Sequence, residues 1–415
     1  MKKIANLTAK NDILDGKQCI KLKYMLYLRK DDEPDYSVII YRREVTDYKL
    51  REYGKEFFDG MLPTENDIIF EGPIEPQYFY ADFIDYDIEI DKVYVYWVGR
   101  KNVLEDVSAP VPVKARDPYI FWNFEKINSK MESLAEKFDD VEIVEFGKTV
   151  RHRPLKAIIA GNREDLIALV GTIHPAESGP EILLRFLEDV LENSPELLKK
   201  TGVAVLPSAN LDGREKMANG SPWYLRKNEN EVDLNRNFEC DWYDVSKGYG
   251  NSTDVPECET YRGDYPNSEP ETCALINMIK TLKPKAVMSF HWLSSVTGDS
   301  ALSSRKAFKD NNVAYIKRVD EMTRIYTNAF RDCAGVARID ESKRRTNYGD
   351  CSSGSFITWC YSQDIVAVDF EAWDEWNQGA LKGAEIDKTT REQLDFATRC
   401  HTAALKALMA SDFKG

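Results

Sequence analysis

The chain has 415 residues, 43% of them hydrophobic, which is enough for two domains that each bury a core. Its formal net charge of −14 argues against a nucleic-acid-binding protein, because such proteins usually present a basic face. The sequence contains no apolar run long enough to cross a bilayer, so we expect neither nucleic acid nor a membrane as a partner.

The start of the chain carries two lysines with no apolar segment after them, and this pattern predicts no secretory signal. Eight cysteines are spread from Cys19 to Cys400 without a CxxC pair, as is typical of reduced thiols. Both features favour a cytoplasmic location, an expectation that an additional upstream signal would overturn.

The N-terminal part is rich in Tyr, Ile and Val, and several of its short segments alternate apolar and polar residues. Turn-forming or charged stretches separate them, which predicts strands at residues 19–30, 36–45, 66–72, 78–90 and 92–101. Short strands at such spacing favour a small all-β sandwich domain over residues 1–115. Pro110, Pro112 and Pro118 mark its end, because proline is poorly tolerated inside a paired strand.

The pattern changes after residue 115. Apolar runs predict strands at residues 165–174, 202–210, 285–292 and 364–373, and helical spacing predicts helices at 123–138, 179–193, 269–282 and 389–410. Strands that alternate with helices predict an α/β domain over residues 116–415, with helices on both faces of the sheet.

His174 and Glu177 lie between a predicted strand and a predicted helix. His174 follows the apolar run IALVGTI, and Glu177 comes three residues later, just before the helix that starts near Pro180. A tight turn there can aim both side chains at one point, where open α/β sheets place their ligands. A surface histidine beside a glutamate that favours a helix start would give the same pair.

A second histidine, His291, also ends an apolar strand, KAVMSF. The chain has four histidines, and we expect the other two, His152 and His401, to be structural or exposed. Two histidines and one carboxylate form a known catalytic zinc site that leaves a position open for water.

Four further motifs, SANLDGRE, LRKNENEVDLNRNF, SFHW and FEAW, follow one another in the order found in one family. Together they resemble the M14 family of zinc carboxypeptidases, from about Tyr119 to the C-terminus. The resemblance implies a mixed central sheet flanked by helices, one Zn²⁺ per chain and a peptide substrate with a free C-terminal carboxylate. Residues 91–117 resemble the end of a fibronectin type III-like domain.

The resemblance assigns the metal and its immediate chemistry to five residues. His174, Glu177 and His291 match the zinc ligands, and Asp233 matches the acid that orients the first zinc histidine. Glu371 matches the general base, so a zinc-bound water would attack the last peptide bond while Glu371 transfers its proton.

The resemblance also assigns residues that bind the substrate. Asn235 and Arg236 match the pair that grips the terminal carboxylate, for which the planar guanidinium is well suited. Arg226 is our candidate for stabilising the oxyanion, with Lys227 as its rival, because Glu229 occupies the second arginine position of the family's Arg-Lys-x-Arg spelling.

Two further assignments concern the substrate's side chain. Tyr348 best matches the family's mobile tyrosine, although one extra residue precedes Gly354. Phe356 falls at the floor of the side-chain pocket, and an apolar floor argues against strictly basic terminal residues. Because the N-terminal part resembles a sandwich and not an inhibitory pro-domain, we expect activity without proteolytic cleavage.

Two other functions stay open at the level of sequence. One is a hydrolase of the same family that acts on cell-wall peptides or acyl-amino acids. The other is a non-catalytic binding protein on a peptidase scaffold, which the presence of all three ligand residues together with Glu371 disfavours.

Overall fold

The computed structural model describes residues 4–26, 37–46, 58–73, 80–101, 103–177, 179–221, 224–243, 253–291, 301–340, 346–348, 353–370 and 390–415. The chain forms two compact units. One unit comprises Met1–Phe121 and Lys216–Tyr224, and the other comprises Trp122–Glu215 and Leu225–Gly415.

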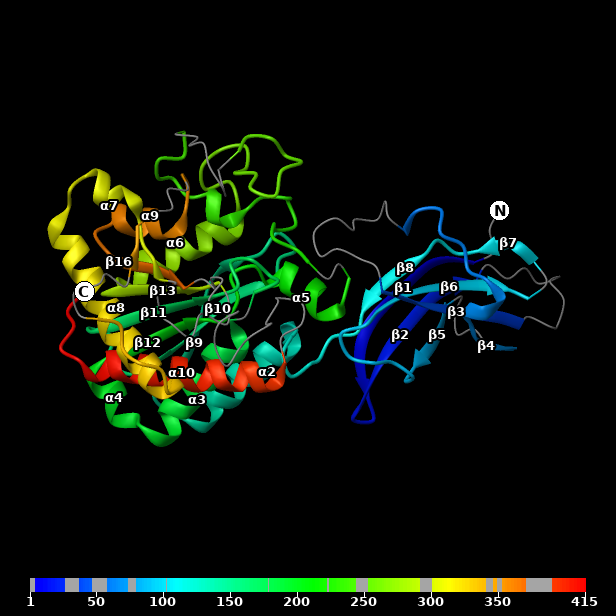
Figure 1. Cartoon of the computed structure of the whole chain (residues 1–415), viewed down its shortest axis with the longest axis horizontal. Helices are drawn as coiled ribbons and strands as arrows, with labels where there is room; N and C mark the ends of the chain where they lie inside the picture. Colours follow the sequence, from blue (N-terminus) through cyan, green and yellow to red (C-terminus); the bar gives the residue numbers. More distant parts are fainter. Residues whose placement is uncertain are drawn as a thin grey trace. The chain divides into compact units, whose positions relative to one another are not determined.

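The first unit is built from antiparallel β-strands (Figure 1). One sheet has the order β1-β2-β5, and the other has the order β4-β3-β6-β7 with β8 paired to β6. Apolar residues of β2, β3 and β6 share one core, so the two sheets face each other, as the sequence predicts. The elements are β1 (Ile4–Leu14), β2 (Lys17–Leu26), β3 (Ser37–Val45), η1 (Glu65–Asp67), β4 (Ile68–Pro73), β5 (Tyr80–Asp85), β6 (Val93–Arg100), β7 (Val103–Val107) and β8 (Val111–Lys114).

The second unit contains an eight-stranded mixed sheet with the order β15-β14-β16-β13-β11-β12-β10-β9. Its centre, from β16 to β12, is parallel, while β10 pairs with β12 and β14 pairs with β16 in antiparallel fashion. This confirms the mixed sheet that the family resemblance implies. The strands are β9 (Val141–Lys148), β10 (Pro154–Ala160), β11 (Leu166–Gly171), β12 (Gly202–Leu206), β13 (Ala286–Phe290), β14 (Ala301–Leu302), β15 (Thr346–Asn347) and β16 (Val366–Phe370).

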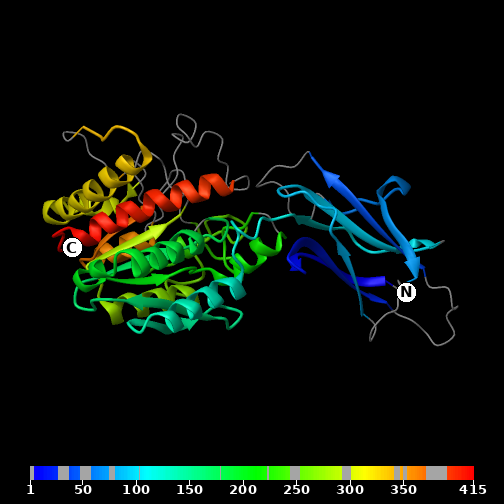
Figure 2. The ribbon, with the colours of Figure 1, turned by 90° about the horizontal axis from the view of Figure 1, so that it is seen from below.

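Helices cover both faces of this sheet (Figures 1 and 2). One face packs against α2 (Phe124–Lys137), α3 (Pro180–Asn193), α4 (Pro195–Lys200), α8 (Val313–Ala334) and α10 (Arg391–Ala410). The other face packs against α6 (Pro270–Leu282) and α9 (Phe356–Ser362). The remaining elements are α5 (Leu211–Asn219), η2 (Leu234–Arg236) and α7 (Arg305–Lys309).

The alternation of side chains along the strands decides which face a functional residue joins. In β16, Val366, Val368 and Phe370 enter the core beneath α3, α8 and α10, whereas Ala367 enters the core beneath α6 and α9. Asp369 therefore lies on the α9 side of the sheet.

The described residues include no helix that is both long enough and apolar enough to cross a membrane. The cysteines in the described part of the chain are free thiols, at positions 19, 240, 258, 273, 333, 360 and 400.

Candidate metal centre

Three neighbouring parallel strands, β11, β13 and β16, end side by side. Gly171 of β11 pairs with Phe290 of β13, which in turn pairs with Phe370 of β16. His291 follows β13 directly, and its backbone N–H donates to the carbonyl of Phe370 at 3.0 Å. The second histidine, His174, follows β11 after a short turn. Strand pairing thus brings residues more than 100 positions apart to one edge of the sheet.

The turn after β11 is fixed by its own backbone and by the chain after β12. The N–H of Glu177 donates to the carbonyl of His174 at 3.1 Å, which closes the turn. Ala209 donates its N–H to the carbonyl of Gly171 at 2.9 Å. Gly171 is required there, because a Cβ atom would lie 2.2 Å from the carbonyl oxygen of Pro207.

Arg214 of α5 stabilises the same turn by hydrogen bonds to its backbone. Its Nη1 donates to the backbone carbonyls of Pro175 at 3.1 Å and Glu177 at 3.0 Å, and its charge pairs with Glu181. Both partners of this ion pair are buried. The sequence motifs gave no role to Arg214, although it directly supports the backbone between two candidate ligands.

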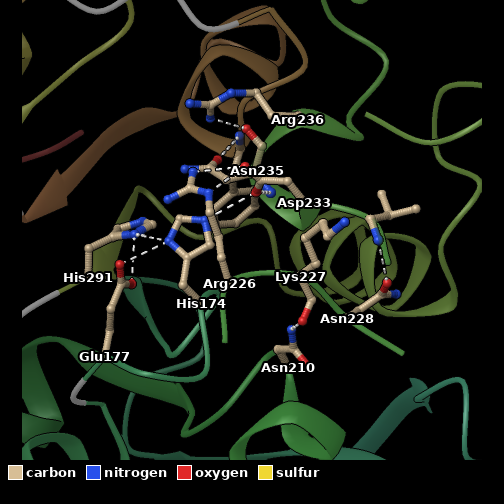
Figure 3. A network of polar contacts seen from close by, with 12 residues as sticks. His174, Glu177, Asn210, Arg226, Lys227, Asn228, Asp233, Asn235, Arg236 and His291 are labelled. Atoms are coloured by element: carbon tan, nitrogen blue, oxygen red, sulfur yellow. Dashed lines mark hydrogen bonds and ion pairs between the residues drawn. The ribbon is translucent and has the colours of Figure 1, made fainter. Parts of the chain in front are cut away.

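His174, Glu177 and His291 point toward one another (Figure 3). The two Nδ1 atoms are 3.2 Å apart. Each also lies 3.0 Å from one oxygen of Glu177, His174 from Oε1 and His291 from Oε2. All three side chains are buried.

The outer nitrogen of each ring faces oxygen atoms. Nε2 of His174 lies 3.1 Å from Oδ1 of Asp233. Nε2 of His291 lies 3.1 Å from Oγ of Ser289 and 3.4 Å from Oδ1 of Asp369. Both nitrogens of each ring thus lie near a carboxylate oxygen, which only accepts hydrogen bonds when ionised. With a cation on the Nδ1 side, the ring protons stand on Nε2 and the Nδ1 lone pairs face the cation. In that state two lone pairs and a carboxylate converge on one point, an arrangement that a cation between them stabilises.

The cluster fits Zn²⁺ in donor type and in spacing. A tetrahedral site with Zn–N bonds of about 2.0–2.1 Å separates its ligand atoms by roughly 3.3 Å. The three separations of 3.0, 3.0 and 3.2 Å are close to that value. Moreover, the buried Oε2 of Glu177 accepts no hydrogen bond from the described part of the chain, as expected of an oxygen reserved for a metal.

Electrostatics keep the carboxylates of this centre ionised. Burial raises the pKa of Glu177, but the positive charge that His174 and His291 carry when protonated lowers it more, so that it falls below its usual value. Burial also raises the pKa of Asp233, and Arg226, Arg236 and His174 together hold that pKa well below its usual range.

Asp233 joins the candidate ligand His174 to the residues predicted to bind substrate. Its Oδ1 faces His174 and accepts the backbone N–H of Asn235 at 3.0 Å. Its Oδ2 accepts Nε of Arg226 at 2.8 Å and lies 2.8 Å from Nη2 of the same guanidinium. Arg226 therefore lies beside the cluster, as Figure 3 shows.

Asn235 and Arg236 lie in η2 and are buried. Oδ1 of Asn235 accepts the backbone N–H of Phe356 at 2.8 Å, and Nη1 of Arg236 donates to the carbonyl of Asn235 at 2.7 Å. Gly354 lets the chain before α9 approach this closely. It has φ +72°, and a Cβ atom there would lie 2.1 Å from the carbonyl oxygen of Arg236.

Lys227, the rival of Arg226, has other partners. Its Nζ donates to the carbonyl of Pro256 at 3.0 Å and lies 3.2 Å from Oε2 of Glu231. Its own backbone carbonyl accepts Nδ2 of Asn210 at 3.2 Å (Figure 3). Of these two side chains, Arg226 is the one that contacts Asp233.

Tyr348 and Phe356 are both packed. The Tyr348 hydroxyl donates to Oδ1 of Asp320 at 3.2 Å, and its ring meets the edge of Phe308 at 4.6 Å. Phe356 is fully buried, and its ring centroid lies 5.1 Å from that of Phe238. Phe356 thus contacts Asn235 through its backbone N–H, whereas Tyr348 contacts residues of α8 and α7.

Glu371, the predicted general base, lies outside the described residues. The residue two positions before it, Asp369, and the strand partner Ser289 both contact His291. The sequence interpretation missed these two. Their signal in the sequence is a single polar residue within each of the apolar runs VAVDF and AVMSF, at positions that lie on the same face of the sheet.

The chain matches the family model for zinc carboxypeptidases over residues 127–396. Human mast cell carboxypeptidase A is 27% identical over 212 residues, which cover 46% of this chain and 49% of that protein. The mouse protein of the same name is 29% identical over 327 residues, or 71% of this chain and 74% of that protein. The match to the human relative thus spans about half of its length.

Solved structures show the same fold. Bovine thrombin-activatable fibrinolysis inhibitor, in complex with tick carboxypeptidase inhibitor, superposes with a TM-score of 0.54 at 21% identity, covering 70% of this chain and 97% of that one. Carboxypeptidase A from Helicoverpa armigera gives a TM-score of 0.52 at 17% identity, with coverages of 72% and 76%.

Proposed function

The chain belongs to the zinc carboxypeptidase family, and on that premise we propose that it hydrolyses the C-terminal peptide bond of peptides. One observation carries the proposal: Nδ1 of His174, Nδ1 of His291 and the carboxylate of Glu177 converge in a buried cluster that fits a metal ion. The same set of ligands forms catalytic zinc sites that activate water for hydrolysis. A bound cation also offsets the free energy cost of burying the Glu177 carboxylate.

In this proposal His174, Glu177 and His291 hold one Zn²⁺. When bound, the ion polarises the scissile carbonyl and makes water a better nucleophile at neutral pH. Asp233 keeps the proton of His174 on Nε2, so that Nδ1 stays directed at the metal position. Glu371 takes the proton from the attacking water and delivers it to the leaving amine, a role assigned from its position in FEAW.

Asn235 and Arg236 bind the free carboxylate of the substrate in this account. A planar guanidinium forms two parallel hydrogen bonds with a carboxylate, and an amide N–H adds a neutral donor. Arg226 stabilises the negative charge that develops on the carbonyl oxygen, and its contact with Asp233 supports this choice over Lys227. We propose that Phe356 closes the side-chain pocket and that Tyr348 contacts the bound substrate.

The test compares the purified full chain with the variant Glu371→Gln. Metal content is measured by mass spectrometry, and release of the terminal amino acid is measured on peptides that end in Phe, Leu, Ala or Lys. We expect about one zinc per chain in both proteins and turnover only in the unchanged protein. Preference for Phe or Leu over Lys is expected if Phe356 forms an apolar floor.

Amidated copies of the same peptides serve as the control for carboxylate recognition, and they should not be cleaved. A cell-wall stem peptide and an N-acyl amino acid test the two other substrate classes. Turnover of these with none of the linear peptides would contradict the proposal. Equal turnover by wild type and Glu371→Gln would contradict the role of Glu371.

A further inference from the structure

Asp369 is a buried carboxylate that none of the motifs assigns. It is the fourth residue of β16 and pairs in register with Ser289 of β13. Its Oδ1 lies 3.4 Å from Nε2 of His291, and its Oδ2 accepts Nδ2 of Asn235 at 3.4 Å. Its two oxygens therefore face a candidate metal ligand on one side and a predicted substrate-binding residue on the other.

The orientation of Asn235 is fixed from its far side. Its Oδ1 accepts the N–H of Phe356, the first residue of α9, at 2.8 Å. The amide nitrogen must then face Asp369. His291 presents its outer nitrogen in the same direction, so the carboxylate of Asp369 lies between these two nitrogen atoms.

This placement is costly unless it serves the site. Asp369 is 3% exposed, and no lysine or arginine pairs with it among the described residues. Its Oδ1 accepts no hydrogen bond of normal geometry within that same part of the chain. A buried carboxylate with an unsatisfied oxygen lowers stability. A metal ion on Nδ1 of His291 would polarise the ring and make its Nε2–H a stronger partner for that oxygen.

We infer that Asp369 is the positioning residue of His291 and that it also orients Asn235. The inference rests on the proposed function, since it needs His291 to be a metal ligand. Asp233 makes the equivalent contacts on the other side of the cluster, to Nε2 of His174 and to the backbone N–H of Asn235. Two carboxylates thus hold the two imidazoles, and both meet at Asn235.

The test uses Asp369→Asn in the full chain, because asparagine has the same shape. Its amide can offer an oxygen to only one of the two N–H groups, and its own nitrogen repels the other. We expect the zinc dissociation constant, measured by competition with a chromophoric chelator, to rise about 10–100-fold. KM for a peptide with a free carboxylate should rise as well, because Asn235 loses its orientation.

Ser303→Ala is the matched control. Ser303 is buried and donates to the carbonyl of Ala367 in β16 at 2.8 Å, without contact to His291 or Asn235 among the described residues. Its removal should leave the zinc dissociation constant within about twofold of wild type, because this hydrogen bond does not orient a metal ligand. An equal loss in both variants would reduce Asp369 to a structural role and overturn the inference.

A second readout needs no variant. The chain has four histidines, so selective ¹⁵N labelling of imidazoles can identify which nitrogen of His291 carries the proton in the zinc-loaded protein. We expect the proton on Nε2. A proton on Nδ1, or an Asp369→Asn protein that binds zinc as tightly as wild type, would overturn the inference. If wild type itself neither binds zinc nor releases amino acids, the proposed function fails first.

Discussion

At the scale of single residues, the contacts of Asp233 explain why one side chain links several roles. Both of its oxygens are occupied, one by His174 and the N–H of Asn235, the other by the guanidinium of Arg226. A buried carboxylate is tolerated when its oxygens are paired in this way. A substitution of His174, Asn235 or Arg226 is therefore expected to shift Asp233 and, through it, the other two residues.

Arg226→Ala should lower kcat on peptide substrates by about 10²–10³-fold, because it removes a donor for the developing oxyanion. Lys227→Ala, its neighbour in sequence, should change kcat less than about threefold, because its Nζ binds the carbonyl of Pro256 instead. Steady-state kinetics with matched zinc content decides between them. A larger loss in Lys227→Ala would reverse the assignment.

The two histidines were candidates from sequence because each follows an apolar strand and because the chain has only four histidines. The resemblance to the zinc carboxypeptidases then assigned His174, Glu177 and His291 as ligands, and the structure brings them together. Asp369 could not be ranked in the same way, since its role depends on the neighbouring strand. A polar residue inside VAVDF has no visible partner until β13 and β16 are paired.

At the scale of elements, the turn between β11 and α3 depends on a residue of α5. Arg214 donates to the carbonyls of Pro175 and Glu177 and pairs with Glu181 beneath them. Removing one partner of a buried ion pair costs about 3–5 kcal/mol, because the remaining charge stays buried. The geometry of the ligand turn and the stability of the unit are thus linked.

Arg214→Met should therefore lower the free energy of unfolding by about 3–5 kcal/mol and weaken zinc binding. Adding Glu181→Gln should restore part of the stability, because no lone charge remains. It should not restore the zinc affinity, because the two carbonyls of the turn still lack their donor. Urea unfolding and chelator competition measure the two effects. Recovery of both together would show that Arg214 only balances charge.

Glu271, in the first turn of α6, gives this region a pH dependence. Burial, with a smaller contribution from the nearby Glu269, raises the pKa of Glu271 to about 7 against the hydrogen bonds from Val150 and Asn228, which lower it. The folded state therefore binds this proton more tightly than the unfolded state, whose carboxyl has a pKa near 4.5. The stability that this group contributes is fully present below pH 4.5 and is lost as the pH rises through about 7.

The contribution of Glu271 amounts to about 3 kcal/mol between these limits. Glu271→Gln cannot ionise, so its stability relative to wild type should increase from pH 5 to pH 8. The exposed Glu164→Gln is the control and should run parallel to wild type. Urea unfolding across this range tests the sign. A wild-type advantage that grows with pH would contradict it.

Elements with a strong apolar period were predicted within a few residues, as α2, α3, α6 and α10 show. The segment Ile4–Leu14 was missed because its Asn, Asp, Lys and Ala residues are uncommon in strands, and it becomes a strand by pairing with β2. The 22-residue helix α8 was missed because half of its buried residues are Tyr or Thr, which have modest helix propensity. Tertiary pairing decides such segments, and local sequence does not show it.

At the scale of the whole molecule, the family match and the two units divide the chain in a similar way. The family model covers residues 127–396, which leaves most of the all-β unit outside it. That unit also includes Lys216–Tyr224, where the N–H of Lys114 donates to the carbonyl of Gly220 at 2.8 Å. A contact between residues 106 positions apart leaves no pattern in the sequence, so this part of the division could not be predicted.

Anomalous X-ray scattering at the zinc absorption edge, from crystals grown with Zn²⁺, tests the convergence of the three ligands most directly. We expect one strong peak per chain, about 2.0–2.2 Å from Nδ1 of His174, Nδ1 of His291 and the carboxylate of Glu177. No peak at this position, or a zinc ion bound through Nε2 of either histidine, would contradict the account.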